Sequence, residues 1–271
     1  MLDELHCESY RDVARVFNPL TQHAAIGSIL IGLTCSPVYV DSRNEPSCAL
    51  TWTKSRIYLS GELRDEDKRR AAETIGNKIK LENLRHGAKY FVVYIDLGMS
   101  QPDFIELLEN VEVRPDTRNY YELDARTREW GEVPVEGLRL EFIDRRFLSK
   151  PYKNIDQVKE EMCSERSSVE EFLEKSVGVC GVIGDEVASW CMSEYNHSDR
   201  YEIGIATIEE HRRRGLATAT AYALMRRCLE HGYNRVGWHC WKRNEPSNRT
   251  ALKLGFRFVE SYPVYVLRVE R

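Results

Sequence analysis

A basic turn that contains a glycine lies between a β-prone run and a helical run in the second half of the chain. The β-prone run covers residues 202–208, the turn residues 212–217 and the helical run residues 216–230. Gly215 and Ala217 let the main chain approach a ligand closely, and the first helical turn leaves several N–H groups unpaired. These donors, the positive end of the helix dipole and three consecutive arginines favour an anion at one place. The pattern predicts a site for a diphosphate-bearing cofactor.

Two common phosphate-binding motifs do not fit this turn. A mononucleotide P-loop needs glycine, four residues and then glycine-lysine-serine or glycine-lysine-threonine, a string that the sequence lacks. A dinucleotide fingerprint needs three glycines and an acidic residue at the end of the next strand. Only Gly215 is present, and the next strand ends at Trp241. The remaining candidate is coenzyme A.

The turn resembles the pyrophosphate loop of the GNAT superfamily of N-acetyltransferases. In that family glutamine or arginine is followed by two residues, a glycine, one residue, and a glycine or alanine. Residues 212–217 follow the pattern as Arg-Arg-Arg-Gly-Leu-Ala. The resemblance implies acetyl-CoA as co-substrate and no metal. The cofactor-binding residues that it implies are Ile205, Ala206, Thr207, Arg212, Arg213, Arg214, Gly215, Leu216, Ala217, Thr218, Asn244 and Ser247.

The resemblance continues to the end of the chain. Residues 236–241 resemble the fifth strand of the fold, and residues 247–253 resemble a short helix that ends at Leu-Gly-Phe with Gly255 as its C-cap. We expect the last two strands at residues 257–259 and 264–269, connected as a hairpin around the only proline between them. Two matching halves in the right order and spacing carry the resemblance.

Glu202 is the candidate catalytic base. It lies ten residues before Arg212, the offset found in branches of the superfamily that use a glutamate on the strand before the loop. Burial would raise the pKa of such a glutamate towards neutrality and suit it to deprotonate an ammonium. The alternative is a solvated glutamate on the outer face of a strand. His197, Asp199 and Glu194 in the preceding hairpin could line the acceptor site instead.

The position of the usual acid departs from the family pattern. Many members carry a tyrosine four residues before the glycine of Leu-Gly-Phe, and here that position is Ala251. Tyr262, Tyr265, Tyr195 or a water molecule would have to protonate the departing thiolate, although a thiolate also leaves without a dedicated acid.

The resemblance implies direct transfer in a ternary complex. Main-chain N–H groups of residues 205–207 would polarise the thioester carbonyl, and binding both substrates together supplies an entropic advantage. A covalent route through Cys240 or Cys191 is disfavoured, because neither cysteine has a visible histidine-carboxylate partner.

The composition is that of an ordinary globular protein, with 42% hydrophobic and 30% charged residues, but the charge is unevenly distributed. Residues 211–271 hold 13 Lys and Arg against 4 Asp and Glu, which suits an anionic cofactor. A nucleic-acid partner is disfavoured because no recognised nucleic-acid motif accompanies these arginines. The acidic remainder would suit a cationic amine as acceptor, or solubility alone.

The eight cysteines do not predict a disulfide framework or a zinc site. The first ten residues are polar, and the apolar run at residues 24–33 is too short to span a membrane, so we expect a cytoplasmic protein with free thiols. Cys228, His231, His239 and Cys240 do not form a convincing zinc set. The last two are neighbours on a strand and would point to opposite faces, and no C-x-x-C pair exists.

The predicted fold class is α/β (α+β), with a mixed twisted sheet of GNAT type and flanking helices in residues 134–271, after a smaller α/β domain in residues 1–133. The boundary is placed at a linker-like segment within residues 126–137. In the second domain a crossover helix at residues 216–230 would join two parallel strands. The N-terminal helices are expected at residues 8–17, 65–84 and 102–110, and the strands at 49–53, 56–60, 90–96 and 119–123.

The two-domain layout resembles the group related to the zwittermicin A resistance acetyltransferase. The N-terminal domain, as a degenerate copy of the same fold, would form a wall of the acceptor site or a homodimer surface. Two hypotheses follow: an enzyme that acetylates a primary amine of a small molecule, and a non-catalytic acyl-CoA-binding module of the same fold. Peptide N-termini, lysine side chains, polyamines and aminoglycosides all remain open as acceptors.

Overall fold

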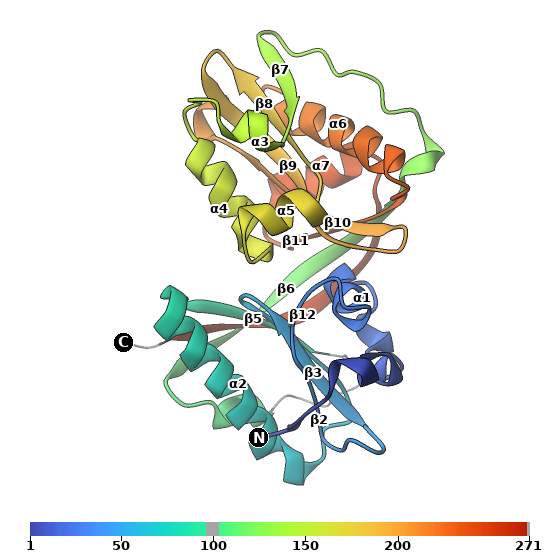
Figure 1. Cartoon of the computed structure of the whole chain (residues 1–271), viewed down its shortest axis with the longest axis vertical. Helices are drawn as coiled ribbons and strands as arrows, with labels where there is room; N and C mark the ends of the chain where they lie inside the picture. Colours follow the sequence, from blue (N-terminus) through green and yellow to red (C-terminus); the bar gives the residue numbers. More distant parts are fainter. Residues whose placement is uncertain (96–102, 270–271) are drawn as a thin grey trace. The chain divides into compact units, whose positions relative to one another are not determined.

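The computed structural model describes residues 1–95 and 103–269, which divide into two compact units. The chain passes from one unit to the other within strand β6 (Val111–Asp124), returns briefly for Trp241–Arg243 at the end of strand β11 (Arg235–Trp241), and passes again within strand β12 (Arg257–Val269) (Figure 1). Each unit is therefore built from segments that are distant in the sequence. Unit 1 comprises Met1–Arg118, Trp241–Arg243 and Ser261–Arg271, and unit 2 comprises Asn119–Cys240 and Asn244–Glu260.

The division between the two units does not fall in the linker-like segment within residues 126–137. Unit 2 already begins at Asn119, within β6, and the second half of β12 belongs to unit 1. Sequence reasoning looks for boundaries in irregular segments, because few contacts cross them. Here the first and last changes of unit fall inside the regular strands β6 and β12, where composition gives no signal.

Unit 1 contains a sheet with the strand order β1-β2-β3-β4-β5-β12. The apolar face of helix α2 packs on it, with Ala71, Ile75 and Ile79 against Ile57 and Phe91. This long helix also provides the crossover that parallel strands β4 and β5 require. The elements are β1 (Asp3–Glu4), η1 (Cys7–Val13), η2 (Asn18–Leu20), α1 (Ala24–Leu30), β2 (Val38–Val40), β3 (Cys48–Thr53), β4 (Arg56–Gly61), α2 (Asp65–His86), β5 (Tyr90–Ile95) and η3 (Asp103–Leu107).

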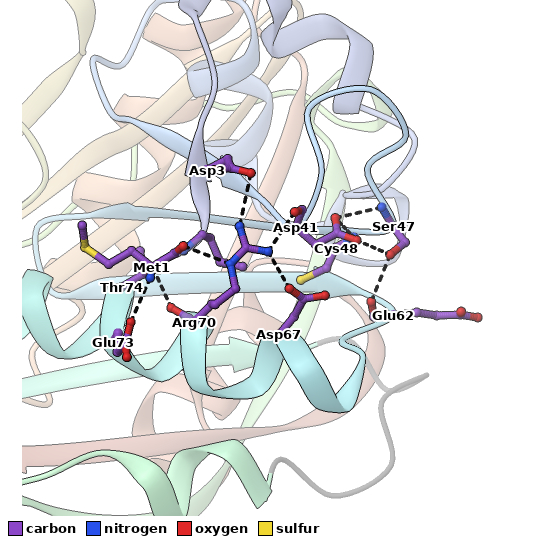
Figure 2. A network of polar contacts seen from close by, with 11 residues as sticks. Met1, Asp3, Asp41, Ser47, Cys48, Glu62, Asp67, Arg70, Glu73 and Thr74 are labelled. Atoms are coloured by element: carbon purple, nitrogen blue, oxygen red, sulfur yellow. Dashed lines mark hydrogen bonds and ion pairs between the residues drawn. The ribbon is translucent and has the colours of Figure 1, made fainter.

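One guanidinium ties α2 to the edge of this sheet (Figure 2). Arg70 donates to Asp67 Oδ1 at 2.6 Å, to Asp3 Oδ2 at 3.2 Å, and to the main-chain oxygens of Met1 and Asp41 at 3.1 and 3.0 Å. The Asp41 carboxylate in turn accepts the N–H groups of Ser47 and of the next residue, each at 3.0 Å. Burial opposes ionisation of Asp41, but these hydrogen bonds outweigh it and lower its pKa. The cluster is structural and fixes the N-terminal strands on α2.

Unit 2 contains a sheet with the strand order β6-β11-β10-β9-β8-β7. Helix α6 covers one face, where Leu224 packs with Trp238, and helices α3, α4 and α5 cover the other, where Met162 packs with Trp190 (Figure 1). The elements are η4 (Ala125–Thr127), β7 (Leu138–Phe142), α3 (Arg145–Leu148), α4 (Ile155–Glu165), α5 (Val169–Lys175), β8 (Gly178–Ile183), β9 (Glu186–His197), β10 (Arg200–Thr207), η5 (Glu209–His211), α6 (Leu216–Glu230), β11 (Arg235–Trp241) and α7 (Glu245–Lys253).

Several predicted elements differ from the structure. The predicted hairpin at residues 257–269 is wrong, since β12 is one continuous strand. Pro263 precedes Val264, the first residue of β12 in register with β5, so its missing N–H does not interrupt that ladder. The predicted helix at residues 8–17 is the shorter 3₁₀ helix η1, which begins without a side-chain cap.

Two further predictions extend beyond the described residues. The strand predicted at residues 90–96 is β5, and its last residue, Asp96, lies outside the described residues. The helix predicted at residues 102–110 is the short η3, and Pro102 also lies outside them.

Candidate active site

Strands β10 and β11 form a fork in unit 2. Their parallel register pairs Arg200, Tyr201 and Glu202 with Arg235, Val236 and Gly237, and no later pair follows in the register. Both strands continue, to Thr207 and Trp241 respectively, so they diverge towards their carboxyl ends. A ligand can therefore enter between two strands of one sheet without breaking a hydrogen-bonded ladder.

Alternation along β10 determines which main-chain groups face the open side of the fork. The N–H of Ile208 donates to Ala188 O of β9 at 2.9 Å. The carbonyl oxygen of Ala206 accepts a hydrogen bond from the hydroxyl of Ser189, also on β9, at 2.7 Å. Because main-chain groups alternate in an antiparallel ladder, the N–H groups of Ile205 and Thr207 face away from β9, and that of Ala206 faces it. Only two of the three N–H groups considered for carbonyl polarisation face the fork.

The turn before α6 is shaped for an anion. Arg213 and Gly215 both have left-handed main-chain angles, with φ of 62° and 86°. An added Cβ at Gly215 would meet Val135 Cγ2 at 3.7 Å, an ordinary contact, so the glycine is required by its φ and not by lack of space. Gly215 caps α6 without a side-chain hydrogen bond, which leaves the first N–H groups of a fifteen-residue helix directed at the turn.

A cavity of about 980 Å³ occupies the fork between β10, the turn and α7. This size lies at the upper end of ordinary ligand pockets. The structure brings together all but one of the cofactor-binding residues expected from the sequence. Those that line the cavity are Ile205, Ala206, Thr207, Arg212, Arg213, Gly215, Leu216, Ala217, Thr218, Asn244 and Ser247.

Arg214 is the exception, because it is not among the residues that line the cavity. Its Nη1 lies 2.8 Å from Nδ1 of His211, whose Nε2 lies 3.1 Å from Oε2 of Glu186. These contacts fix the base of the turn. Of the three consecutive arginines, two line the cavity, and the third is held by its contact with His211 and through it with Glu186.

Helix α7 forms the opposite wall of the cavity. Asn244 Oδ1 accepts the N–H of Ser247 at 3.2 Å, and Ser247 Oγ accepts the indole N–H of Trp238 at 3.1 Å. Two cations that the sequence analysis did not select, Arg249 and Lys253, also line the cavity. Their spacing of four on a predicted helix places them on one face, so the sequence contained a signal for them.

Glu202 lies at the closed end of the fork and is 2% exposed. The alternative of a solvated glutamate on an outer face is therefore wrong. Tyr201 and Ile203 belong to the core beneath α6, so Glu202 between them points to the opposite face. Tyr201 pairs with Asn196 and Ile203 with Ser193, which leaves one extra residue on β9 opposite Glu202. Such bulges are frequent beside active sites.

Two aromatic rings of unit 2, those of His239 and Tyr120, lie near Glu202. His239 Nε2 lies 3.8 Å from Glu202 Oε1, and the ring of Tyr120 stacks on the imidazole with centroids 4.6 Å apart. An added Cβ at Gly237 would lie 3.3 Å from Glu202 Cγ, so glycine leaves room for the carboxylate. Burial raises the pKa of Tyr120 to about 12, with Arg200 opposing the shift and the nearby carboxylates adding to it. The sequence analysis did not connect these rings with Glu202.

A family model for GNAT acetyltransferases matches residues 15–265. The chain belongs to the GNAT acetyltransferase family. The family assignment supports an acyltransferase, and it includes most of the first half, where no short motif carried the resemblance. None of the helices within residues 1–95 and 103–269 is long and apolar enough to cross a membrane.

Relatives match almost the whole length of this GNAT chain. The uncharacterized N-acetyltransferase YdfB of Bacillus subtilis (strain 168) is 26% identical over 266 residues, which is 98% of each chain. A GCN5-related N-acetyltransferase-like protein from Streptococcus suis 89/1591 is 25% identical, with a TM-score of 0.69 over 96% of this chain and 99% of that one. A tandem GNAT protein from the clavulanic acid biosynthesis pathway shares the fold, at 13% identity and a TM-score of 0.57 over 100% of this chain and 99% of that one.

The usual acid position of the GNAT pattern carries no hydroxyl here. Ala251 is fully buried in the core beneath α6. Among the tyrosines considered as substitutes, Tyr195 donates to Glu165, while Tyr262 and Tyr265 belong to unit 1. Tyr121, which the sequence analysis did not consider, donates to Asn248 Oδ1 at 2.6 Å. Tyr195 and Tyr121 thus each have a hydrogen-bond acceptor already.

The cysteines of this GNAT chain are all free thiols. Burial raises the pKa of Cys191 well above its usual value, which disfavours the thiolate that a covalent route needs. Cys240 Sγ lies 3.3 Å from Asn248 Oδ1. Burial therefore disfavours an acyl-cysteine at Cys191.

Proposed function

We propose that this chain transfers an acetyl group from acetyl-CoA to a primary amine of a small molecule in a ternary complex. One relationship carries the proposal: a phosphate-suited cavity occupies the open end of the β10–β11 fork, and a buried glutamate lies at its closed end. A cofactor that enters the fork would have its phosphates at the turn and its thioester towards Glu202.

The residues that line the cavity fit coenzyme A. The N–H groups at the start of α6 and the cations Arg212, Arg213, Arg249 and Lys253 suit its phosphates. The indole ring of Trp238 offers apolar contact, and the main chain of β10 offers hydrogen bonds, to the narrow pantetheine arm. Acetyl-CoA would supply an activated acyl group with a thiolate as leaving group.

The roles of the chain's own residues follow from their positions. Glu202 accepts the proton that the acceptor ammonium loses, so that the neutral nitrogen can attack the thioester carbonyl. The N–H groups of Ile205 and Thr207 donate to the carbonyl oxygen as negative charge develops on it. The C–N bond forms and the C–S bond breaks, and the second proton that the nitrogen loses as the amide forms passes to the departing thiolate without a dedicated tyrosine acid. Holding both substrates in the fork converts the reaction into an intramolecular one.

A second candidate is a non-catalytic acyl-CoA-binding module. The observation in its favour is Ala251, which is buried where many relatives carry the acid. In such a module the cavity would keep its affinity for coenzyme A and Glu202 would have no proton to accept.

Thiol release from acetyl-CoA, measured against a panel of amines with an acceptor-free control, separates the two candidates. Acceptor-dependent release that falls in Glu202→Gln supports the enzyme. Coenzyme A binding by calorimetry without turnover on any amine supports the module. If calorimetry detects no coenzyme A binding, both candidates fail.

A further inference from the structure

The cavity of the fork has a second group of cations besides those of the turn. The residues of α7 that line it are Pro246, Ser247, Arg249, Thr250 and Lys253. Their spacings of three and four place them on one face of the helix, so this face borders the cavity from the first turn of α7 to its last residue. Arg249 and Lys253 are the charged residues of this face, and both are exposed.

Neither of these two cations is held in a strong ion pair. Arg249 Nη1 lies 3.3 Å from Glu245 Oε2, and the two side chains are 72% and 76% exposed. A pair as exposed as this contributes little, so the guanidinium can exchange its partner for a ligand. Lys253 has no carboxylate within ion-pair distance among residues 1–95 and 103–269.

Arg128 fixes the carboxyl end of α7 beside α6. It donates to the carbonyl oxygen of Leu254 at 3.0 Å and to the hydroxyl of Tyr222 at 2.5 Å. Tyr222 lies six residues beyond Leu216, which is about 9 Å along the axis of α6. The last turn of α7 therefore borders the cavity further along α6 than the basic turn does, and the two groups of cations come from different places.

The basic turn by itself suits a diphosphate. The N–H groups at the start of α6, with Arg212 and Arg213, provide donors and positive charge for two joined phosphoryl groups. The cations of α7 have no counterpart in such a ligand and suit a further phosphate. Coenzyme A carries one, a phosphate monoester on the ribose, which is separated from the diphosphate by the sugar ring.

We infer that Arg249 and Lys253 bind the ribose phosphate of coenzyme A and select the cofactor for it. The inference rests on the proposed function for the identity of the cofactor, and it adds the residues that distinguish coenzyme A from its dephospho form. A phosphate monoester carries about two negative charges at neutral pH. Arg249 offers it paired hydrogen bonds from a planar guanidinium, and Lys253 offers a point charge.

Isothermal titration of the full chain with coenzyme A and with dephospho-coenzyme A tests the inference without turnover. The dephospho form keeps the diphosphate, the adenosine and the pantetheine arm, so the two ligands differ only in the ribose phosphate. We expect coenzyme A to bind at least about tenfold more tightly. The double variant Arg249→Gln, Lys253→Gln should lose this preference and keep the parent affinity for dephospho-coenzyme A.

Two further variants separate phosphate binding from general effects of charge and stability. Arg249→Lys should keep part of the preference, because it retains the charge and loses the paired geometry. The double variant Arg226→Gln, Arg227→Gln removes the same charge from α6 outside the cavity lining and should leave both affinities unchanged. Lys253 lies in the last turn of α7, where a cation also stabilises the helix dipole, so thermal unfolding of each variant is measured as well.

The outcomes distinguish this inference from the proposed function. Equal affinity of the parent chain for the two ligands would overturn the inference and leave coenzyme A as the cofactor. An equal loss for both ligands in the Arg249→Gln, Lys253→Gln variant would also overturn it, because the cations would then act on the diphosphate or on the fold. If the parent binds neither ligand, the proposed function fails as well. A preference for coenzyme A that depends on these cations, without thiol release on any amine, would support the subsite and favour the acyl-CoA-binding module.

Discussion

Glu202 Oε1 and His239 Nε2 lie 3.8 Å apart on the neighbouring strands β10 and β11, and both side chains are almost fully buried. The parallel register explains the approach: Glu202 is opposite Gly237, and His239 follows two residues later on the same face. The ring of Tyr120 stacks on the imidazole, with ring centroids 4.6 Å apart. The candidate base therefore has a polar partner that limits its orientations.

Removing the carboxylate tests the base directly. We expect Glu202→Gln to lower kcat/KM by about 10²- to 10⁴-fold, because proton transfer to a positioned base contributes that much. Thiol release should be followed from pH 6 to pH 9, with coenzyme A affinity as the control. Activity within a few-fold of the parent across this range would show that Glu202 is not the base.

Replacing His239 tests whether it positions Glu202. His239→Phe keeps a ring for Tyr120 to stack on and removes the polar nitrogen that faces the carboxylate. We expect kcat to fall by about tenfold, less than in Glu202→Gln, with coenzyme A affinity unchanged. An equal effect in the Glu202→Gln background would mean that the histidine acts independently of the glutamate.

The loop glycine offers a matched pair of variants. Gly215→Ala should cost about 1 kcal/mol of stability through its φ of 86° while keeping coenzyme A binding, since an added Cβ meets only an ordinary contact. Gly215→Glu adds a negative charge where phosphates are proposed to bind and should abolish the binding. Calorimetry with coenzyme A measures both. Retained affinity in the glutamate variant would contradict the placement of the phosphates.

Restoring the tyrosine of the family pattern should not restore an acid. Ala251 is fully buried, so Ala251→Tyr inserts a large side chain into a packed core, and we expect a loss of at least about 1–3 kcal/mol. Chemical denaturation measures the loss. A stable variant with faster turnover would instead show that the core has room for the hydroxyl and that the acid limits the parent enzyme.

The pH dependence of stability can be tested at Glu171, near the start of α5. Burial would raise the pKa of this carboxyl, but hydrogen bonds from Ser167 and Lys175 outweigh burial and lower it from 4.5 to about 2. A lowered pKa stabilises the fold above the unfolded value, and this contribution is lost as the pH falls from about 4.5 towards 2.

Glu171→Gln should therefore lower the free energy of unfolding at pH 7 by up to about 1 kcal/mol, given the partial exposure of the site. The difference from the parent should shrink at pH 3. Denaturant unfolding at the two pH values measures it, and an equal difference at both would contradict the assigned pKa.

Local pattern in the sequence was sufficient to predict the strand–turn–helix segment whose residues line the cavity of the fork. The helix at residues 216–230 and the cavity-lining positions around Gly215 follow from a glycine, neighbouring arginines and the start of a helical period, which all act within one strand–turn–helix segment. The position of Asn244 and Ser247 on the opposite wall came from the family resemblance and not from local pattern. Arg249 and Lys253 were readable from helical spacing but were not selected.

Only the tertiary structure decided the environment of the candidate base and the division of the chain. Whether Glu202 is buried, and that His239 and Tyr120 lie beside it, depends on strand register and on the neighbour that β11 takes in the sheet, which is β6. The sequence period of two shows that a residue alternates, but not which strand lies next to it. For the same reason β6 and β12 could not be recognised as strands shared by two units, because pairing partners are chosen by long-range packing that leaves no local pattern.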